Sequence, residues 1–573
     1  MRIKHFFGLA VLAAMTASCS SNNELVNGGN GSGEVENGTA YASFKINLPT
    51  TSGTRADDPK QGTPSFEQGT AAEYEVKNGT ILIFDANTDK FVTSAELGTM
   101  NPWTDVNKDG VTTAAIATVK LTGVTVSGNY KALVLLNNNT TDDATKKVTL
   151  PTTADTYATW SKDDKKANAD NYVSTNGIFM ANAPMYSATS EPTTLVKIKN
   201  VCASPEEAQA KAATTIYVER GLAKVTMKDF ETGGYSIGGG TYDGATVKIE
   251  KWQLDVTNKS TYPVHQIGGL SSATTGFADI WKTDRFYDQT STAFKRVYWG
   301  VDPNYNNADY QTLENCKTAF NMITNDKVTG DAGEANPQYC LENTFDLDNM
   351  KQGQTTRVVF KAVFTPKGFK DTEKTFYKIG NNTDIWKEAD LKQQIKTVAL
   401  TAMGITDPEE QKKYDVDLTK GTNISGKAGQ HLIKADNITY TDEAASSEVK
   451  ENVVKKINEK LKTINDKLGL SAETGISTYL NGEAYYIARI KHFNELTPWT
   501  AGTAYDSNNA AFLGRYGVLR NNWYELSVNK VSGLGYPDVP EVKPTVPDDE
   551  NDQYINVSVK ILSWAKRSQS IDL

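Results

Sequence analysis

The residue types that most often carry chemistry are few in this sequence, and they are poorly spaced for it. His265, His431 and His492 lie far apart, and none belongs to an H-x-x-x-H or H-E-x-x-H motif, the spacing of many zinc sites. No G-x-S-x-G nucleophile elbow occurs, and the glycine-rich stretch 238–244 has Asp243 where a dinucleotide-binding loop needs its last glycine. The sequence therefore predicts no enzyme and no cofactor.

The acidic stretch DVNKDG is the one candidate metal site. Asp105, Asn107 and Asp109 match the first ligands of a calcium-binding loop, and Gly110 matches the glycine of its sharp turn. The twelfth position of such a loop carries a glutamate that binds with both oxygens, but here it is Ile116. We therefore favour a polar surface turn without a metal, and keep the three acidic and amide residues as a weak alternative.

Charge and cysteine content exclude further classes of function. The 573-residue chain carries a net charge of −9, which argues against nucleic acid as a partner. After Cys19 only Cys202, Cys316 and Cys340 remain, too few for a disulfide framework and without a C-x-x-C motif. Cys316 and Cys340 could pair in an oxidising compartment, although isolated buried thiols fit the sequence equally well.

The first residues indicate export and a lipid anchor. A basic start precedes an apolar run, 6–15, that is too short to span a membrane as a stable helix, so 1–18 is interpreted as a signal peptide. The stretch TASC that ends at Cys19 resembles a bacterial lipobox, in which the cysteine is lipidated, for example with palmitate, and becomes the new N-terminus. Ser20 after it resembles outer-membrane lipoproteins. The alternative is an ordinary signal peptide with an incidental cysteine.

Most of the remaining chain predicts β-strands. Alternating or continuous apolar runs rich in Tyr, Val, Thr and Ile recur between loops of Gly, Asn, Asp and Thr, which is typical of β-sandwiches. Helices are the minority, and the clearest has one apolar face from Ser446 to Leu468. A shorter helix begins at Ser204. The sequence thus predicts a mainly β fold in two domains, 56–220 and 221–550.

Two strands with the same alternation stand at the two ends of the chain. The first precedes a loop of small residues that contains Arg55, and the last follows a Pro- and Asp-rich linker, 535–553, whose part 536–547 predicts a flexible arm. The last strand has no evident partner, and both strands could also belong to one ordinary sheet. Each presents four apolar side chains on one face: Ala42, Phe44, Ile46 and Leu48 in the first, and Ile555, Val557, Val559 and Ile561 in the last.

These features together resemble the fimbrillins of Bacteroidales-type bacteria, also called type V pilins. The resemblance rests on the lipobox, the first strand, the pair Arg55 and Ala56, the Pro-rich linker and the last strand. It covers the whole chain in layout and is specific at the two ends. It rests also on the stretches AYYIARIKHFNELTPWT (484–500), LRNNWYELSVNKVSGLGYP (519–537) and ILSWAKRSQSIDL (561–573).

The resemblance implies a fold and a route of assembly. It implies a lipoprotein precursor in the outer membrane, with 19–55 as a lipidated propeptide, and an arginine-specific protease that cuts after Arg55 to free Ala56. Each subunit would have two transthyretin-like β-sandwich domains and a detachable C-terminal donor strand, 551–573, by which copies polymerise head to tail into an extracellular adhesive fimbrium. Its partners would be other copies of the chain, accessory tip and anchor subunits, the protease, and receptors on host or bacterial surfaces.

The first strand is then expected to act as a plug. A sandwich that lacks an edge strand exposes apolar side chains and unpaired backbone groups. The plug would cover them until the cut at Arg55, after which the donor strand of another copy would enter by β-augmentation. In this interpretation the apolar face of the donor strand matters most, and Asn556 and Ser558 on the opposite face matter less.

Two other classes of function stay open at this point. A pilus-tip subunit or a monomeric surface lipoprotein could act as an adhesin for a glycan or a host protein, and neither needs to donate a strand. A secreted enzyme such as a glycosidase would need a pair of carboxylates in a cleft. Such a pair cannot be chosen from the sequence among 69 acidic residues.

Overall fold

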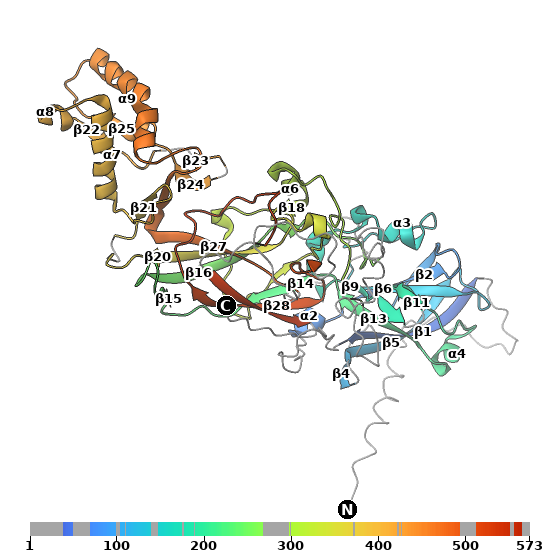
Figure 1. The fold of residues 1–573 in the computed structure, drawn as a ribbon. Coiled ribbons are helices and arrows are strands. Elements are labelled where there is room, and N and C mark those ends of the chain that lie inside the picture. The colour runs from blue at the N-terminus through green and yellow to red at the C-terminus, as the bar shows by residue number, and fades with distance from the viewer. Residues whose placement is uncertain are drawn as a thin grey trace, which may run out of the picture. The chain divides into compact units, whose positions relative to one another are not determined.

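The computed structural model divides the chain into two compact units (Figure 1). The described residues of the first unit lie in 38–49, 69–221 and 262–265, and those of the second in 222–261 and from 266 onward. Strands outnumber helices in the described part of both, which confirms the predicted mainly β fold. The structure describes 38–49, 69–98, 104–108, 111–138, 147–174, 177–187, 190–267, 297, 299–370, 373–420, 423–425, 427–492, 512–549 and 555–563.

A nine-stranded sheet is the framework of the first unit. The elements of this unit are β1 (Thr39–Pro49), α2 (Ala71–Tyr74), β2 (Gly79–Asp85), β3 (Phe91–Glu96), β4 (Thr104–Lys108), β5 (Val111–Thr122), β6 (Tyr130–Leu136), α3 (Tyr157–Ser161), β7 (Val173–Ser174), β8 (Gly177–Ile178), β9 (Met180–Asn182), β10 (Met185–Ser187), β11 (Ser190–Thr193), β12 (Val196–Lys197), α4 (Pro205–Ala210) and β13 (Thr214–Arg220). The strand order is β3-β2-β6-β9-β13-β1-β5-β4, and β12 pairs with β6 beside this path.

Apolar residues at every second position of the inner strands build the core of the first unit. A buried amide helps to join these strands: the side chain of Asn182 in β9 accepts a hydrogen bond of 2.8 Å from the backbone N–H of Val134 and donates one of 2.8 Å to the carbonyl of Thr194. Buried polar groups need such partners, so this position tolerates an asparagine inside the core. Core residues from β2, β6 and β13 include Ile81, Ile83, Ala132, Val134, Ile216 and Val218.

Three four-stranded sheets form the framework of the second unit. Its strands are β14 (Ala223–Met227), β15 (Tyr235–Ser236), β16 (Thr246–Asp255), β17 (Thr257–Asn258), β18 (Phe320–Asn321), β19 (Gln338–Cys340), β20 (Arg357–Thr365), β21 (Phe376–Ile379), β22 (Tyr414–Val416), β23 (Asn423–Ile424), β24 (Lys427–His431), β25 (Ile438–Tyr440), β26 (Ile476–Tyr479), β27 (Glu483–Arg489), β28 (Asn522–Val531) and β29 (Ile555–Ser563). The sheet orders are β19-β14-β28-β29, β15-β16-β20-β27 and β21-β26-β24-β23. The first two sheets share one core, which contains Trp252, Phe360, Tyr486 and Tyr524.

A helical insertion lies between β21 and β26. Its helices are α7 (Glu388–Met403), α8 (Pro408–Gln411) and α9 (Ser447–Lys467), whereas α6 (Leu313–Ala319) lies earlier in the chain. The hydroxyl of Ser446 caps α9, and Gly469 follows its end with a positive φ of 71°, so the helix predicted from Ser446 to Leu468 is confirmed. No helix in the described residues has the length and apolarity that crossing a membrane requires.

Candidate functional site

β1 lies inside the sheet of the first unit, with a hydrogen-bonded neighbour on each side. It runs parallel to β13, with Phe44 opposite Thr214, and antiparallel to β5, with Phe44 opposite Ala117. The edge position expected for this strand is therefore wrong. Without β1, the facing backbone groups of both neighbours would have no partners, and a buried group left unpaired costs about 1–3 kcal/mol.

One face of β1 is part of the core of the first unit. Ala40, Ala42, Phe44 and Ile46 are 0% exposed, and Leu48 is 2% exposed. Burial of a side chain the size of leucine, isoleucine or phenylalanine stabilises a fold by about 1.5–3 kcal/mol. The core of this unit therefore depends on β1, or on another strand that presents a similar apolar face.

The opposite face of β1 is also covered, which the alternation of the sequence does not predict. Ser43 donates a hydrogen bond of 2.8 Å to the carbonyl of Ala208 in α4, and its hydroxyl lies 2.8 Å from Oγ1 of Thr118 in β5. Tyr41 and Cys202 exchange two backbone hydrogen bonds of 2.8 and 2.9 Å. α4 thus covers β1 on the side that faces away from the core, and Cys202 pairs with Tyr41 in the plane of the sheet.

Exposure along β1 is uneven on this second face. Ser43 is 7% exposed and Asn47 only 2%, whereas Lys45 is the one residue among 39–48 that is exposed. The residue types indicate this difference in exposure. Small serine and asparagine side chains can be buried where they find hydrogen-bond partners, whereas a lysine side chain is almost never buried.

β29, at the other end of the chain, pairs with β28 of its own unit. The pairing is antiparallel and extends from Asn522 opposite Ser563 to Val531 opposite Ile555. The sequence shows no evident partner for the last strand, and the structure supplies one within its own unit. β29 is the last strand in the order β19-β14-β28-β29, so only one of its two edges has a hydrogen-bonded neighbour in that sheet.

The Pro-rich stretch before β29 is packed against the second unit. Tyr536 exchanges backbone hydrogen bonds of 2.7 and 2.8 Å with Tyr485 of β27, and the guanidinium of Arg357 donates one of 2.7 Å to the carbonyl of Pro540. Its prolines remove backbone donors, but the carbonyls that remain find partners on other strands. The prediction that 536–547 is a flexible arm is therefore wrong.

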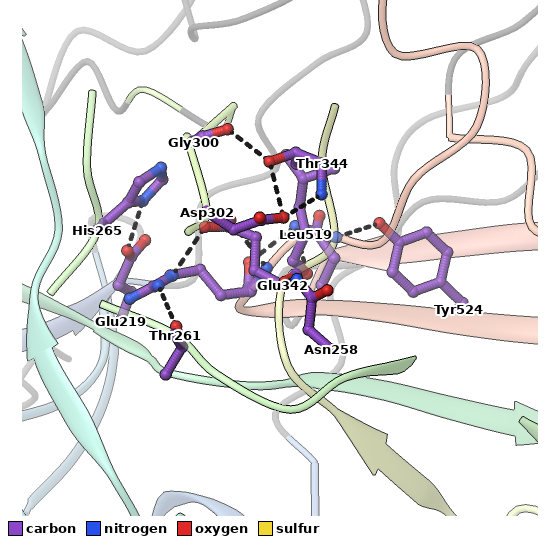
Figure 2. Close-up of polar contacts among 12 residues, drawn as sticks. Glu219, Asn258, Thr261, His265, Gly300, Asp302, Glu342, Thr344, Leu519 and Tyr524 are labelled. Atoms are coloured by element: carbon purple, nitrogen blue, oxygen red, sulfur yellow. Dashed lines mark hydrogen bonds and ion pairs between the residues drawn. The ribbon is translucent and has the colours of Figure 1, made fainter. Parts of the chain in front are cut away.

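A buried polar cluster joins distant segments of the second unit (Figure 2). Nε of Arg520 lies 3.3 Å from Oε1 of Glu342, and the same guanidinium donates to the hydroxyl of Thr261 at 3.2 Å. Asp302 accepts a hydrogen bond of 2.6 Å from the backbone N–H of Thr344. The sequence offered no signal for this cluster, because its members come from separate parts of the chain.

Burial raises the pKa of Asp302 to about 7, and the negative charge of Glu342 adds to the rise. Hydrogen bonds from the backbone N–H groups of Thr344 and Asn304 act in the opposite direction. Asp302 is 2% exposed and Glu342 is 0% exposed, so these two carboxylates are not the accessible pair that a glycosidase needs. The cluster serves to hold segments of the second unit together.

His265 and His492 lie in different units, and each contacts a different side chain. In the first unit, Nδ1 of His265 lies 2.7 Å from Oε1 of Glu219, and both side chains are buried. In the second unit, Nδ1 of His492 lies 2.8 Å from the hydroxyl of Tyr524. Within the part of the chain that the structure describes, no three His, Cys, Asp or Glu side chains group in a way that could hold a metal ion.

Several predicted site residues lie outside the described residues: Cys19, Arg55, Ala56 and Asp109. Lipidation and cleavage therefore stay predictions. Asp105 and Asn107 belong to β4, which pairs with β5, so the surface turn predicted over them is wrong. The thiols of Cys202, Cys316 and Cys340 are free and buried, and the pairing of the last two that the sequence left open is absent from the structure.

The protein is mainly β and has two units. In the first unit the N-terminal strand β1 completes a sheet, and in the second the C-terminal strand β29 lies at the end of a sheet. Residues 477–570 match the family described as "Major fimbrial subunit protein type IV, Fimbrillin, C-terminal". This match lies in the C-terminal part of the chain and confirms its resemblance to the fimbrillin family of fimbrial subunits.

A solved structure is also similar to this chain. It is the crystal structure of a fimbrial assembly protein from Parabacteroides distasonis, with 12% sequence identity and a TM-score of 0.23. The similarity covers 56% of this chain and 95% of that one. No curated protein sequence matches.

Proposed function

We propose that this chain is a structural subunit of a fimbrial stalk, exported as an outer-membrane lipoprotein and activated by cleavage after Arg55. The observation that carries the proposal is the position of β1, which ends at Pro49, a few residues before Arg55. A cut there would separate one internal strand from an otherwise complete unit. The mature subunit would then need a strand from another molecule to restore its sheet.

Tethering explains why the precursor would not polymerise. A strand joined covalently to its own groove has an effective concentration on the order of mM or higher, so a strand from another copy cannot compete with it. Cleavage ends this advantage, because the severed β1 can leave and does not return at a comparable concentration. The groove between β13 and β5 is then open for β-augmentation.

β29 is the strand we assign as the donor. In its own unit it has one hydrogen-bonded neighbour, β28, whereas a strand in the place of β1 has two. The second ladder of backbone hydrogen bonds favours transfer of β29 into the groove of another copy. The resulting contact is head to tail, and it generates an open filament rather than a closed ring.

The proposal extends to partners and location. Mature subunits would lie in an extracellular adhesive fimbrium, with accessory subunits at its tip and anchor and with receptors on host or bacterial surfaces. A tip subunit or a monomeric adhesin has no need of a donor strand. The C-terminal strand and its family match therefore favour a stalk subunit.

Deletion of 554–573 tests the donor role. We expect the truncated chain to fold and to be cleaved, but to form no filaments in electron micrographs of material treated with an arginine-specific protease. Val557→Asp should have the same effect because an unpaired charge in an apolar groove costs several kcal/mol.

Lys560→Gln is the matched control for these variants and should polymerise. Since β29 also pairs with β28, thermal unfolding must show that each variant is folded. Normal fimbriae from the deletion would contradict the proposal.

A further inference from the structure

The plug strand and the donor strand share a sequence as well as a pattern. Residues 42–46 read Ala-Ser-Phe-Lys-Ile, and residues 557–561 read Val-Ser-Val-Lys-Ile. Both are therefore an apolar residue, Ser, an apolar residue, Lys and Ile in the same N-to-C direction. This match suggests which donor residue replaces which plug residue, a question that rests on the proposed function and goes beyond it.

The lysine of this shared sequence selects the register. Lys45 is the one exposed residue among 39–48, and it has Ser43 and Asn47 as buried neighbours on the same face. A donor strand shifted by two residues in either direction would put Lys560 at one of these two buried positions. Burial of an unpaired ammonium is strongly unfavourable, so of these three registers only the one that puts Lys560 at the place of Lys45 leaves its charge in water.

The serine supports the same register independently. The place of Ser43 offers two partners, the carbonyl of Ala208 and Oγ1 of Thr118, each 2.8 Å from the serine hydroxyl. In the register set by the lysine, Ser558 occupies this place and can satisfy both. In the register shifted by two residues toward the C-terminal end of the groove, Asn556 would have to fit there with a larger side chain.

We propose that the donor strand of one copy enters the groove of the next in the direction of β1, parallel to β13, with Ser558 at the place of Ser43 and Lys560 at the place of Lys45. Val557, Val559 and Ile561 then take the core positions of Ala42, Phe44 and Ile46. The face that points away from the core thus determines the register, and the apolar face provides the burial. The expectation that Ser558 matters little does not fit this groove.

The match also predicts where the groove must adjust. Val557 is larger than Ala42, and Val559 is smaller than Phe44, so the core of an acceptor subunit repacks when the donor replaces the plug. Cores tolerate such exchanges when the total volume is nearly conserved. The plug and the donor therefore need not bind equally well, although they share one hydrogen-bonding pattern.

Disulfide trapping in filaments tests the register. Thr118→Cys is combined with Ser558→Cys in one chain and with Asn556→Cys in another, both with Cys202→Ser because Cys202 contacts β1. Filaments are assembled under reducing conditions, oxidised, and analysed on non-reducing gels. We expect a ladder of linked subunits from the Ser558 pair only, and none from chains with a single introduced cysteine. A ladder from the Asn556 pair only, or from neither pair in intact filaments, would overturn the register.

Ser558→Ala provides a second measurement that does not depend on disulfide geometry. Loss of the hydroxyl leaves the carbonyl of Ala208 buried without its donor, and we expect filaments to release subunits in detergent about tenfold faster than the wild type. Ser558→Thr should restore most of the resistance. Release at the wild-type rate from Ser558→Ala would contradict the role of the serine. A wrong register can be distinguished from a wrong proposed function. If the proposed function is wrong, chains that lack 554–573 still form filaments.

Discussion

Asp302 links the stability of the second unit to pH. Its carboxyl is 2% exposed, and burial raises its pKa from an ordinary value of 3.8 to about 7. Between these two values the folded chain binds a proton that the unfolded chain has lost. The contribution of Asp302 to the free energy of unfolding therefore falls as the pH rises from about 4 to about 7, and it is constant above that range.

Asp302→Asn isolates this effect from that of the other acidic residues. The wild type should lose on the order of 3 kcal/mol more stability than the variant between pH 4.5 and pH 8, measured by denaturant unfolding followed through the tryptophans. Asp309→Asn, at an exposed position, is the control and should keep the wild-type dependence. Equal pH profiles for the wild type and Asp302→Asn would show that the buried carboxyl is not protonated in the folded chain.

At the scale of elements, β1 should stabilise the precursor alone. Phe44→Ala removes a side chain that is 0% exposed, and we expect the precursor to lose about 3–5 kcal/mol of stability. Filaments made from the same variant should be as stable as wild-type filaments, because cleavage at Arg55 removes residue 44. Thermal unfolding of both forms checks this, with Lys45→Ala as an exposed control. Filaments weakened by Phe44→Ala would indicate that β1 stays in the mature subunit.

Local patterns made some elements predictable. β1 and β29 follow from alternation, and α9 follows from its apolar spacing between the cap at Ser446 and Gly469. α7 was not predicted, although Leu391 and Ile395 have helical spacing, because its stretch IKTVAL also resembles the composition of a strand. Where two periodicities fit one stretch, the tertiary context decides between them.

Non-local pairings were not predictable. β1 is internal because β13 and β5 lie on either side of it, and neither pairing leaves a mark within residues 39–49. The Pro-rich stretch is packed because Arg357 and Tyr485, from other strands, bond to its backbone. For the same reason the ion pair of Glu342 and Arg520 could not be chosen among the many charged residues.

At the scale of the whole molecule, the expected switch is a single peptide bond. We predict that the subunits of purified fimbriae begin at Ala56, and that Arg55→Ala leaves lipidated monomers on the cell surface. N-terminal sequencing of fimbriae and electron microscopy of cells check the two parts. Arg55→Lys separates the specificity of the protease from loss of the loop, since an arginine-specific enzyme should leave it uncut as well. Fimbriae whose subunits begin at a lipidated Cys19 would contradict the cleavage model.

The place of β1 between β13 and β5 also has a consequence for how the chain folds. β1 is made first, but one of its two neighbours, β13, is made only after the other strands of the first unit. Pairings so distant in sequence form late, so we expect a folding intermediate whose sheet is otherwise built and whose slot for β1 is still empty. That intermediate and the cleaved subunit have the same vacancy. Growth of the filament would then repeat, between molecules, the last step by which each precursor folds.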